Sequence, residues 1–193
     1  MKTIKLIVAI LVFCSMSVNA QIVDTFDSNK FGWTEISGID GDAIIKEGKM
    51  FMECKADGYI ETHCYAPIDF TKDFEIKCDA LVKKVNDKNI FGMLLNYLDD
   101  GNYIAFVLTE GKAELYRYEH YKLIGRIRAD IKLKSQKKAN LQLKIKSTFQ
   151  KLEFFVNDMK ALECRYLPLT SSGMGFYICG KQTINFDNFE ILQ

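Results

Sequence analysis

The chain has 193 residues, and its 26 Lys and Arg almost balance its 25 Asp and Glu. A near-neutral chain with scattered lysines argues against nucleic acid as the main partner, because phosphate binding needs a concentrated basic surface. The length fits one domain with a sizeable core. After residue 20 no stretch approaches the ~20 apolar residues of a transmembrane helix, so no membrane span is expected.

Residues 1–20 have the pattern of a secretory signal peptide. Lys2 and Lys5 form a short basic segment, LIVAILVF is an apolar run too short for a membrane anchor, and SVNA ends in small residues. We expect cleavage after Ala20, which leaves a domain of residues 21–193. The mature protein is therefore expected to be secreted or periplasmic.

From residue 22 onward, apolar and polar residues alternate with the period of two that is typical of β-strands. Turn signals separate the strands, and they are Glu47-Gly48, Asp57-Gly58, DDGN at 99–102, Glu110-Gly111 and Asn157-Asp158. Short strands at this spacing predict an all-β domain, built as a two-sheet antiparallel sandwich or jelly roll. The predicted strands are Ile22–Phe26, Ala43–Lys46, Lys49–Lys55, Tyr59–Tyr65, Asp73–Lys83, Ile90–Tyr97, Tyr103–Thr109, Lys112–Glu119, Leu123–Arg128, Ala139–Ser147, Lys151–Val156, Met159–Arg165, Gly173–Cys179 and Ile184–Leu192.

The segment NYIAFVLTEGKAELYRYEHYK at 102–122 predicts a hairpin with one tyrosine-rich face. We take Glu110-Gly111 as a two-residue turn, which sets the register of the two strands. The resulting pairs are Tyr103–Tyr118, Ala105–Tyr116, Val107–Glu114, Phe106–Leu115 and Leu108–Ala113. The last two pairs point to the opposite face, which is predicted to be core.

The preceding DDGN loop, counted as four residues, places Asn96 opposite Ala105 and Gly92 opposite Thr109. Small residues then lie at the centre of one face, with polar and aromatic side chains around them. Pyranose rings stack on aromatic side chains, and their hydroxyls need amide, carboxylate or phenol partners. A purely structural role explains the same pattern, because tyrosines can cover a sheet while their phenol oxygens contact water. The candidate ligand-binding residues are Asn96, Tyr103, Glu114, Tyr116 and Tyr118.

Five cysteines follow residue 20, an odd number for a compartment that permits disulfides. With Asp57-Gly58 as a two-residue turn, Cys54 lies opposite Glu61 and Cys64 lies opposite Phe51, so these two thiols do not meet. Each cysteine lies in a strand-like run, and none has metal-ligand spacing. We expect Cys54, Cys64, Cys78, Cys164 and Cys179 to be mostly free, buried thiols that pack as small hydrophobes.

No catalytic motif is present in the sequence. Glu75 and Asp79 share one strand face, but about 13 Å separates them at ~3.3 Å per residue. That exceeds the ~5–5.5 Å of a retaining pair of carboxylates and the ~6.5–9.5 Å of an inverting pair. An acid from another strand, paired with Glu114 or Glu119, is an alternative that the sequence leaves open.

The single tryptophan and the two histidines are expected to be structural. Trp33 is either half-buried packing or an aromatic platform for a ligand, and the first fits a position near a strand start better. His63 and His120 have no neighbouring carboxylates at metal-ligand spacing, so we expect ordinary strand or surface residues.

Four segments together resemble one fold family. They are DTFDS…GWTE, FGMLLNYLDDGNYIAFVLTEGKAELYR, NLQLKIKSTFQKLEFFVND and GMGFYICGKQTINFDNFEIL. Their order and spacing resemble concanavalin A-like (laminin G-like) jelly rolls, and most nearly the 3-keto-disaccharide hydrolase-like domains. The resemblance implies this fold and contact with a saccharide or polysaccharide, but it supplies no catalytic residue. It also implies room for a structural calcium near Asp24 and Asp187, although two carboxylates fall short of the six to eight oxygens needed.

Three functions are compatible with these observations. The leading hypothesis is a secreted, non-catalytic carbohydrate-binding domain that needs no cofactor. The alternatives are a glycan-processing hydrolase or lyase of the keto-disaccharide type, and an extracytoplasmic protein-interaction domain. An acid pair on a groove would favour the hydrolase, and a large flat apolar face would favour the interaction domain.

Export is directly testable. Mass spectrometry of the exported protein is expected to show an N-terminus at Gln21, because cleavage follows Ala20. An intact Met1 would contradict this expectation. A lipid on Cys14 would also contradict it, since Phe13 is not the small residue that a lipidation site needs.

Overall fold

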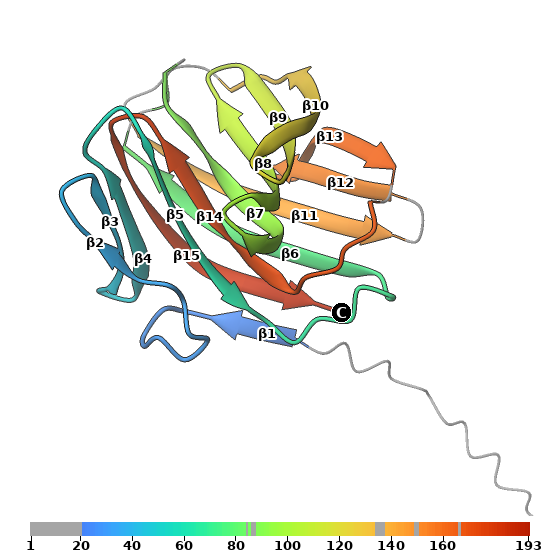
Figure 1. Cartoon of the computed structure of the whole chain (residues 1–193), viewed down its shortest axis with the longest axis horizontal. Coiled ribbons are helices and arrows are strands. Elements are labelled where there is room, and N and C mark those ends of the chain that lie inside the picture. The colour runs from blue at the N-terminus through green and yellow to red at the C-terminus, as the bar shows by residue number, and fades with distance from the viewer. Residues whose placement is uncertain (1–20, 84, 86–87, 134–137, 149–150, 166) are drawn as a thin grey trace, which may run out of the picture.

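The computed structural model describes residues 21–193 apart from 84, 86–87, 134–137, 149–150 and 166, so the predicted signal peptide lies outside the described residues. In the described part, all regular secondary structure is β-strand, arranged in two facing antiparallel sheets (Figure 1). No helix in that part is long and apolar enough to cross a membrane. The all-β, two-sheet prediction is confirmed.

Sheet A has nine strands, which are β1 (Gln21–Asp24), β2 (Ile36–Ser37), β3 (Gly41–Lys46), β4 (Lys49–Cys54), β6 (Phe74–Val82), β11 (Ala139–Thr148), β12 (Lys151–Val156), β13 (Met159–Arg165) and β15 (Gln182–Leu192). Their order is β13-β12-β11-β6-β15-β4-β3-β2, and β1 pairs with the far end of β15. Every predicted strand is present with ends within two residues. The two-residue β2 was not predicted, because it is too short to show a period.

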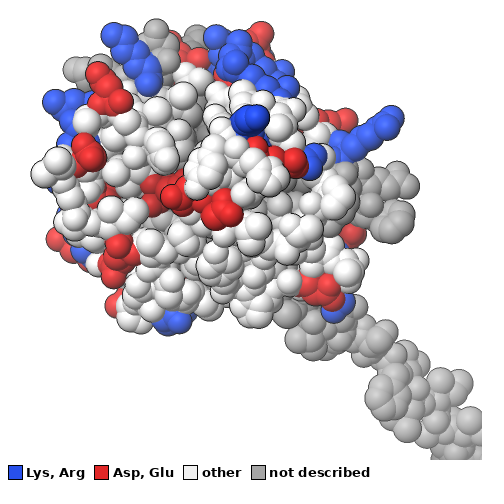
Figure 2. Space-filling view, viewed as in Figure 1, with Lys and Arg blue, Asp and Glu red and all other residues white. Residues whose placement is uncertain are grey.

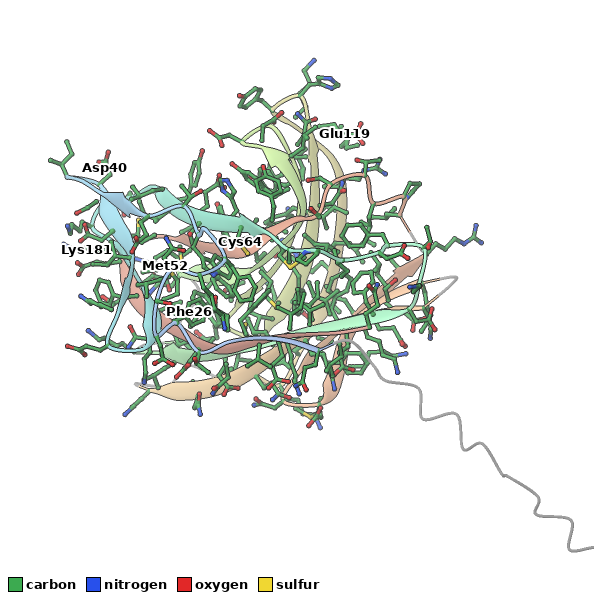
Figure 3. The ribbon with its side chains drawn as sticks, turned by 90° about the horizontal axis from the view of Figure 1, so that it is seen from below. Phe26, Asp40, Met52, Cys64, Glu119 and Lys181 are labelled. Atoms are coloured by element: carbon green, nitrogen blue, oxygen red, sulfur yellow. The ribbon has the colours of Figure 1, made fainter. Side chains whose placement is uncertain are left out.

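Sheet B has six strands, which are β5 (Tyr59–Tyr65), β7 (Ile90–Asp99), β8 (Asn102–Thr109), β9 (Lys112–Glu119), β10 (Lys122–Asp130) and β14 (Gly173–Cys179). Their order is β10-β9-β8-β7-β14-β5. In Figure 3 the yellow-green strands that end near Glu119 rise steeply from the rest of this sheet. The sheet therefore curls away from sheet A, and its outer face is concave.

The core fills the space between the two sheets. Phe106 is 0% exposed, Leu115 is buried opposite it, and the Phe106 ring lies 4.9 Å from that of Phe154 on sheet A. Figure 3 shows Phe26, Met52 and Cys64 between the layers. The predicted register of the hairpin β8–β9 is confirmed.

Trp33 belongs to this core. Its indole stacks on Phe176 at 5.1 Å and donates from Nε1 to Asp24 Oδ2 at 2.8 Å. Asp24 is fully buried, and its other oxygen accepts from the backbone amide of Phe26 at 2.9 Å. The packing role of Trp33 is confirmed, and a ligand platform at this buried ring is excluded.

The predicted pairing of β4 with β5 across Asp57-Gly58 is wrong. β4 lies in sheet A and β5 is the edge of sheet B, so the connection crosses between layers. It is held by Lys55, whose amide donates to Asp40 at 2.9 Å, and by Gly58, whose carbonyl accepts from Gly180 at 2.9 Å. Local turn chemistry fits a crossing as well as a hairpin.

The predicted free thiols are confirmed even so. Cys54, Cys64 and Cys78 are buried, Cys164 and Cys179 are half-buried, and all five are free. Burial raises the pKa of the Cys64 thiol to about 12, which keeps it uncharged and unreactive.

The predicted register of β7 against β8 is also wrong. Leu94, not Asn96, lies opposite Ala105, and Gly92 lies opposite Val107 rather than Thr109. A bulge between Leu95 and Asp99 absorbs two extra residues, and Asn96 adopts a positive φ of 55° there. Because the shift is two residues, the rest of β7 keeps its predicted face.

We expect Phe106→Ala to destabilise the domain by about 3–5 kcal/mol, because it leaves a cavity against Phe154. This is near the whole stability of a marginal domain. Denaturant melts of the purified protein measure the change. A variant that melts with the parent would show that Phe106 does not carry the core.

Candidate functional site

Tyrosine rings line the concave outer face of sheet B. The rings form two groups: Tyr59 and Tyr177 stack at 5.7 Å, whereas Tyr103 stacks on Tyr97 at 6.2 Å and on Tyr118 at 5.0 Å. Tyr116 lies 6.5 Å from Tyr118, edge to face. We call this surface the tyrosine face, and it consists of Tyr59, Tyr97, Tyr103, Tyr116, Tyr118 and Tyr177. Figure 2 shows acidic atoms gathered near the middle of the same side of the molecule.

The floor of the tyrosine face is made by glycines on β14. A Cβ at Gly173 would lie 2.0 Å from the carbonyl oxygen of Tyr97, and one at Gly175 would lie 1.9 Å from that of Thr62. Only glycine permits this close approach of neighbouring strands. With no side chain between them, Tyr97 on β7 reaches across β14 and stacks on His63 of β5 at 4.1 Å.

The Tyr97 phenol bridges two carboxyl groups. Its oxygen lies 3.0 Å from Glu61 Oε1 and 2.5 Å from Asp100 Oδ1. Glu61 comes from β5, whereas Asp100 comes from the turn between β7 and β8. We call Glu61 and Asp100 the carboxyl pair. Glu61 is only 9% exposed, and its Oε2 atom is buried without a hydrogen-bond partner.

A single phenolic hydrogen cannot serve two carboxylates, so both contacts are hydrogen bonds only when one carboxyl group is protonated. Burial raises the pKa of Glu61 above its usual value, and the nearby charge of Asp100 raises it further, although the bond from Tyr97 lowers it. The proton therefore belongs on Glu61. Burial and the bond to Asp100 also raise the pKa of Tyr97, which keeps the phenol neutral.

Two exposed tyrosines stand at the rim of the carboxyl pair. Tyr59 is 55% exposed and Tyr121 is 75% exposed. Tyr121 lies in the turn between β9 and β10, where its amide donates to the Gly101 carbonyl at 3.1 Å. Its ring lies against Gly101, where a Cβ would come within 2.8 Å of it. The two hairpin turns thus hold Tyr121 beside Asp100.

At the other end of the face, Glu114 forms ion pairs with two arginines. Arg126 donates from Nε to Glu114 Oε2 at 2.6 Å, and Arg128 donates to Oε1 at 3.0 Å. Burial alone would raise the pKa of Glu114, but the bonds from Arg126, Tyr116 and Arg128 bring it below its usual value. Arg126 also lies over the Tyr116 ring at 5.4 Å. This end of the face is neutralised.

The structure brings together four of the five predicted ligand-binding residues. Tyr103, Tyr116, Tyr118 and Glu114 share the outer face, as predicted. Asn96 lies off the predicted register, and its side-chain oxygen accepts from the amides of Thr170 and Ser171 at 2.6 and 2.9 Å. It still lies near two of the predicted residues, because it lines a cavity of about 260 Å³ together with Tyr103 and Tyr118.

Sequence reasoning missed the carboxyl pair, Tyr97 and the rim tyrosines. The strand YIETHCY carried a signal, since its alternation places Tyr59, Glu61, His63 and Tyr65 on one face. His63 is a strand residue, as expected, and it is half-buried beside this site, with Nε2 3.2 Å from Thr34 Oγ1. Burial lowers its pKa, so its ring is neutral at neutral pH.

The acids considered for a structural calcium are occupied by other partners in the described part of the chain. Asp79 accepts from Asn188 at 2.9 Å, and Asp187 lies 3.9 Å from Lys49 on the outer face of sheet A. Both oxygens of Asp24 are occupied by protein donors. Across the described residues, no group of three or more His, Cys, Asp or Glu could hold a metal ion.

Comparisons with known proteins place the chain by fold. No protein-family model and no curated protein matches the sequence. Among solved structures, it is similar to the carbohydrate-binding module CBM66 from Bacillus subtilis, with a TM-score of 0.55 and 14% identity over 84% of this chain and 96% of that chain. It is similar to the carbohydrate recognition domain of Emp47p, with a TM-score of 0.62 and 9% identity over 90% and 94% of the two chains.

A third similar structure is the β-glucanase of Bacillus licheniformis, with a TM-score of 0.59 and 7% identity over 91% of this chain and 99% of that chain. None of these three is a 3-keto-disaccharide hydrolase-like domain, so that nearer resemblance stays a prediction. Such low identities show the fold alone. The chain has the concanavalin A-like jelly-roll fold.

Proposed function

We propose that this protein is an exported carbohydrate-binding domain that holds a saccharide on the tyrosine face and does not cleave it. The observation that carries the proposal is the gathering of stacked tyrosine rings on one concave sheet face, beside the exposed carboxyl group of Asp100. An outer sheet face that binds no ligand usually carries polar and charged side chains whose polar groups contact solvent.

The geometry suits an oligosaccharide. From β5 to β9 the face crosses four strand spacings, or about 19 Å at ~4.8 Å each. Aromatic rings offer stacking surfaces along this path, and the exposed carboxyl group of Asp100 accepts hydrogen bonds from sugar hydroxyls. Concave curvature brings both ends of the face toward one ligand. A carbohydrate-binding module and a carbohydrate recognition domain share the fold, which supports the proposal.

A second candidate function is glycoside hydrolysis, and the carboxyl pair favours it. The oxygens of Glu61 and Asp100 that contact Tyr97 are no more than 5.5 Å apart, the sum of contacts of 3.0 and 2.5 Å. Retaining enzymes separate their carboxyls by ~5–5.5 Å, and a raised pKa suits a general acid. Against it, Glu61 is buried behind the bridging phenol, which leaves no open path to a sugar carbon. A β-glucanase on this fold keeps the candidate open.

A glycan array identifies the ligand, and two tyrosine variants test the surface. We expect Tyr118→Ala and Tyr59→Ala each to lose about 1–1.4 kcal/mol of binding, or roughly five- to tenfold in affinity, because each removes a stacking ring. Stability should change little for the half-exposed Tyr59. Calorimetric titration measures affinity, and thermal melts measure stability.

Phe155→Ala, on the outer face of sheet A, is the matched control, and its affinity should equal that of the parent. If the tyrosine variants bind normally but melt early, the tyrosines are packing residues and the proposal fails. If the protein releases reducing sugars from the bound glycan and Asp100→Asn abolishes this release, the function is hydrolysis rather than binding alone.

A further inference from the structure

The edge strands β10 and β13 lie side by side at one side of the sandwich (Figure 1). We call this side the β10–β13 seam. β10 ends the order of sheet B, so along its free side the backbone amides and carbonyls pair with no strand of the described chain. An unpaired edge of nine residues is a template on which an extended segment can form another strand.

Two largely apolar cavities lie along the seam. The first, of about 290 Å³, is lined by Ile127 of sheet B and Cys164 of sheet A, and the second, of about 280 Å³, is lined by Val156. They lie beside residues 124–127 and 130–133, so their centres are six positions apart, about 20 Å at ~3.3 Å per residue. Because six is an even number, side chains on one face of a single extended chain reach both cavities.

Apolar side chains of β10 are exposed at this edge. Leu123 is 46% exposed, Ile124 is 50% exposed and Ile127 is 38% exposed. Ile127 lies opposite the buried Leu115, so it points between the two sheets. Proteins often protect an edge strand with an inward-pointing charge, and β10 has none at Gly125 or Ile127. This edge therefore lacks the usual block against strand addition.

All four arginines of the chain gather at the seam, and they are Arg117 on β9, Arg126 and Arg128 on β10, and Arg165 on β13. Three of them line the first cavity, the exception being Arg128. A planar guanidinium group binds a carboxylate through paired hydrogen bonds. Clusters of arginines are a recurring device for recognising acidic peptide segments.

The acids of the protein leave this cluster positively charged. Glu119 pairs with Arg117, and Glu114 is shared by the two arginines of β10, so two acids serve four arginines. Arg165 has no acidic partner among the described residues, and it lies opposite another cation, Lys151 of β12. Like charges directly opposite each other in a sheet are destabilising. A partner with carboxylates offsets this charge.

A second copy of the chain does not fit the seam. Side chains directly opposite each other in an antiparallel pair lie on the same face. If two β10 strands paired, the registers centred on residues 126, 127 and 128 would place Arg126 opposite itself, Arg126 opposite Arg128, and Arg128 opposite itself. Each register sets arginine against arginine, so the edge favours a partner of opposite charge.

We propose that the β10–β13 seam binds an extended acidic segment of another protein, which adds a strand to the free edge of β10. The segment alternates apolar and acidic residues over at least seven positions. Its apolar side chains enter the two cavities, and its carboxylates on the other face bind the arginines of β10. The first cavity lies on the core side of sheet B, away from the tyrosine face, so this inference does not rest on the proposed function.

The experiment titrates the protein with three labelled nonapeptides that have blocked ends. One alternates valine with glutamate, the second replaces each glutamate by lysine, and the third replaces each valine by serine. Fluorescence anisotropy is expected to show roughly tenfold tighter binding of the valine–glutamate peptide than of either of the others. The lysine peptide lacks the charge that the arginines need, and the serine peptide lacks the apolar side chains that fill the cavities.

Hydrogen exchange followed by mass spectrometry tests whether a strand is added. The valine–glutamate peptide is expected to slow amide exchange in β10, because its backbone occupies the free edge. β5, at the opposite edge of the same sheet, is the internal control and should exchange at an unchanged rate. Protection of β5 in place of β10, or of neither strand, would overturn the proposal.

Two variants assign the contacts. Arg165→Gln and Ile127→Thr are each expected to weaken the valine–glutamate peptide about fivefold, because the first removes an unpaired charge and the second removes apolar surface from the first cavity. Lys46→Gln is the matched control, since it removes one exposed positive charge on β3 of sheet A, and its affinity should equal that of the parent. Arg165 is exposed, so its variant stays informative even if Ile127→Thr melts early.

Three further results would contradict the proposal. Equal affinity for the three peptides would show that neither the arginines nor the cavities select a partner. Binding of heparin but of no peptide would assign the arginines to an anionic glycan. A dimer of the protein alone in sedimentation experiments, lost in Ile127→Thr, would assign the seam to a second copy of the chain.

Discussion

The tyrosine face depends on the contact between Tyr97 and the bare backbone of β14. At Gly173 and Gly175 the neighbouring strands approach so closely that a Cβ would clash with backbone carbonyls. The ring of Tyr97 crosses this gap to reach His63 and Glu61. The bulge in β7 supplies the other half of the arrangement, because it lets Tyr97 project outward near the turn that carries Asp100. Three distant parts of the chain, β5, the end of β7 with its turn, and β14, meet at one phenol.

β5 shows how one strand serves two environments. Ile60 and Cys64 point into the core and follow the ordinary rule of apolar burial, while Glu61 and His63 point to the outer face. Burying Glu61 there opposes folding, since its charge is desolvated and one oxygen is unpaired. Glu114, at the other end of the face, shows the alternative, in which arginines offset the same desolvation. A buried carboxyl group whose desolvation is not offset by a cation is typical of functional sites.

Local patterns predicted the strands and the hairpin β8–β9, because alternation and a two-residue turn act over a few residues. The same reasoning failed at Asp57-Gly58, where a turn signal marks a crossing between sheets that only the packing of the two layers determines. The predicted register at Asn96 was wrong, because the length of the loop does not reveal a bulge within the strand. The carboxyl pair could not be predicted from the sequence. Glu61 and Asp100 meet through the Tyr97 side chain, and neither strand pattern determines where that side chain lies.

The burial of Trp33 has a practical consequence for spectroscopy. The only tryptophan of the chain stacks on Phe176, on the core side of β14, whereas most of the nine tyrosines lie on the outer side of the same sheet. Tryptophan emission therefore reports whether the two layers are docked and is shielded from events at the surface. Tyrosine absorbance reports the environment of the outer face. The two chromophores give independent optical signals for the interior and the exterior of a single sheet.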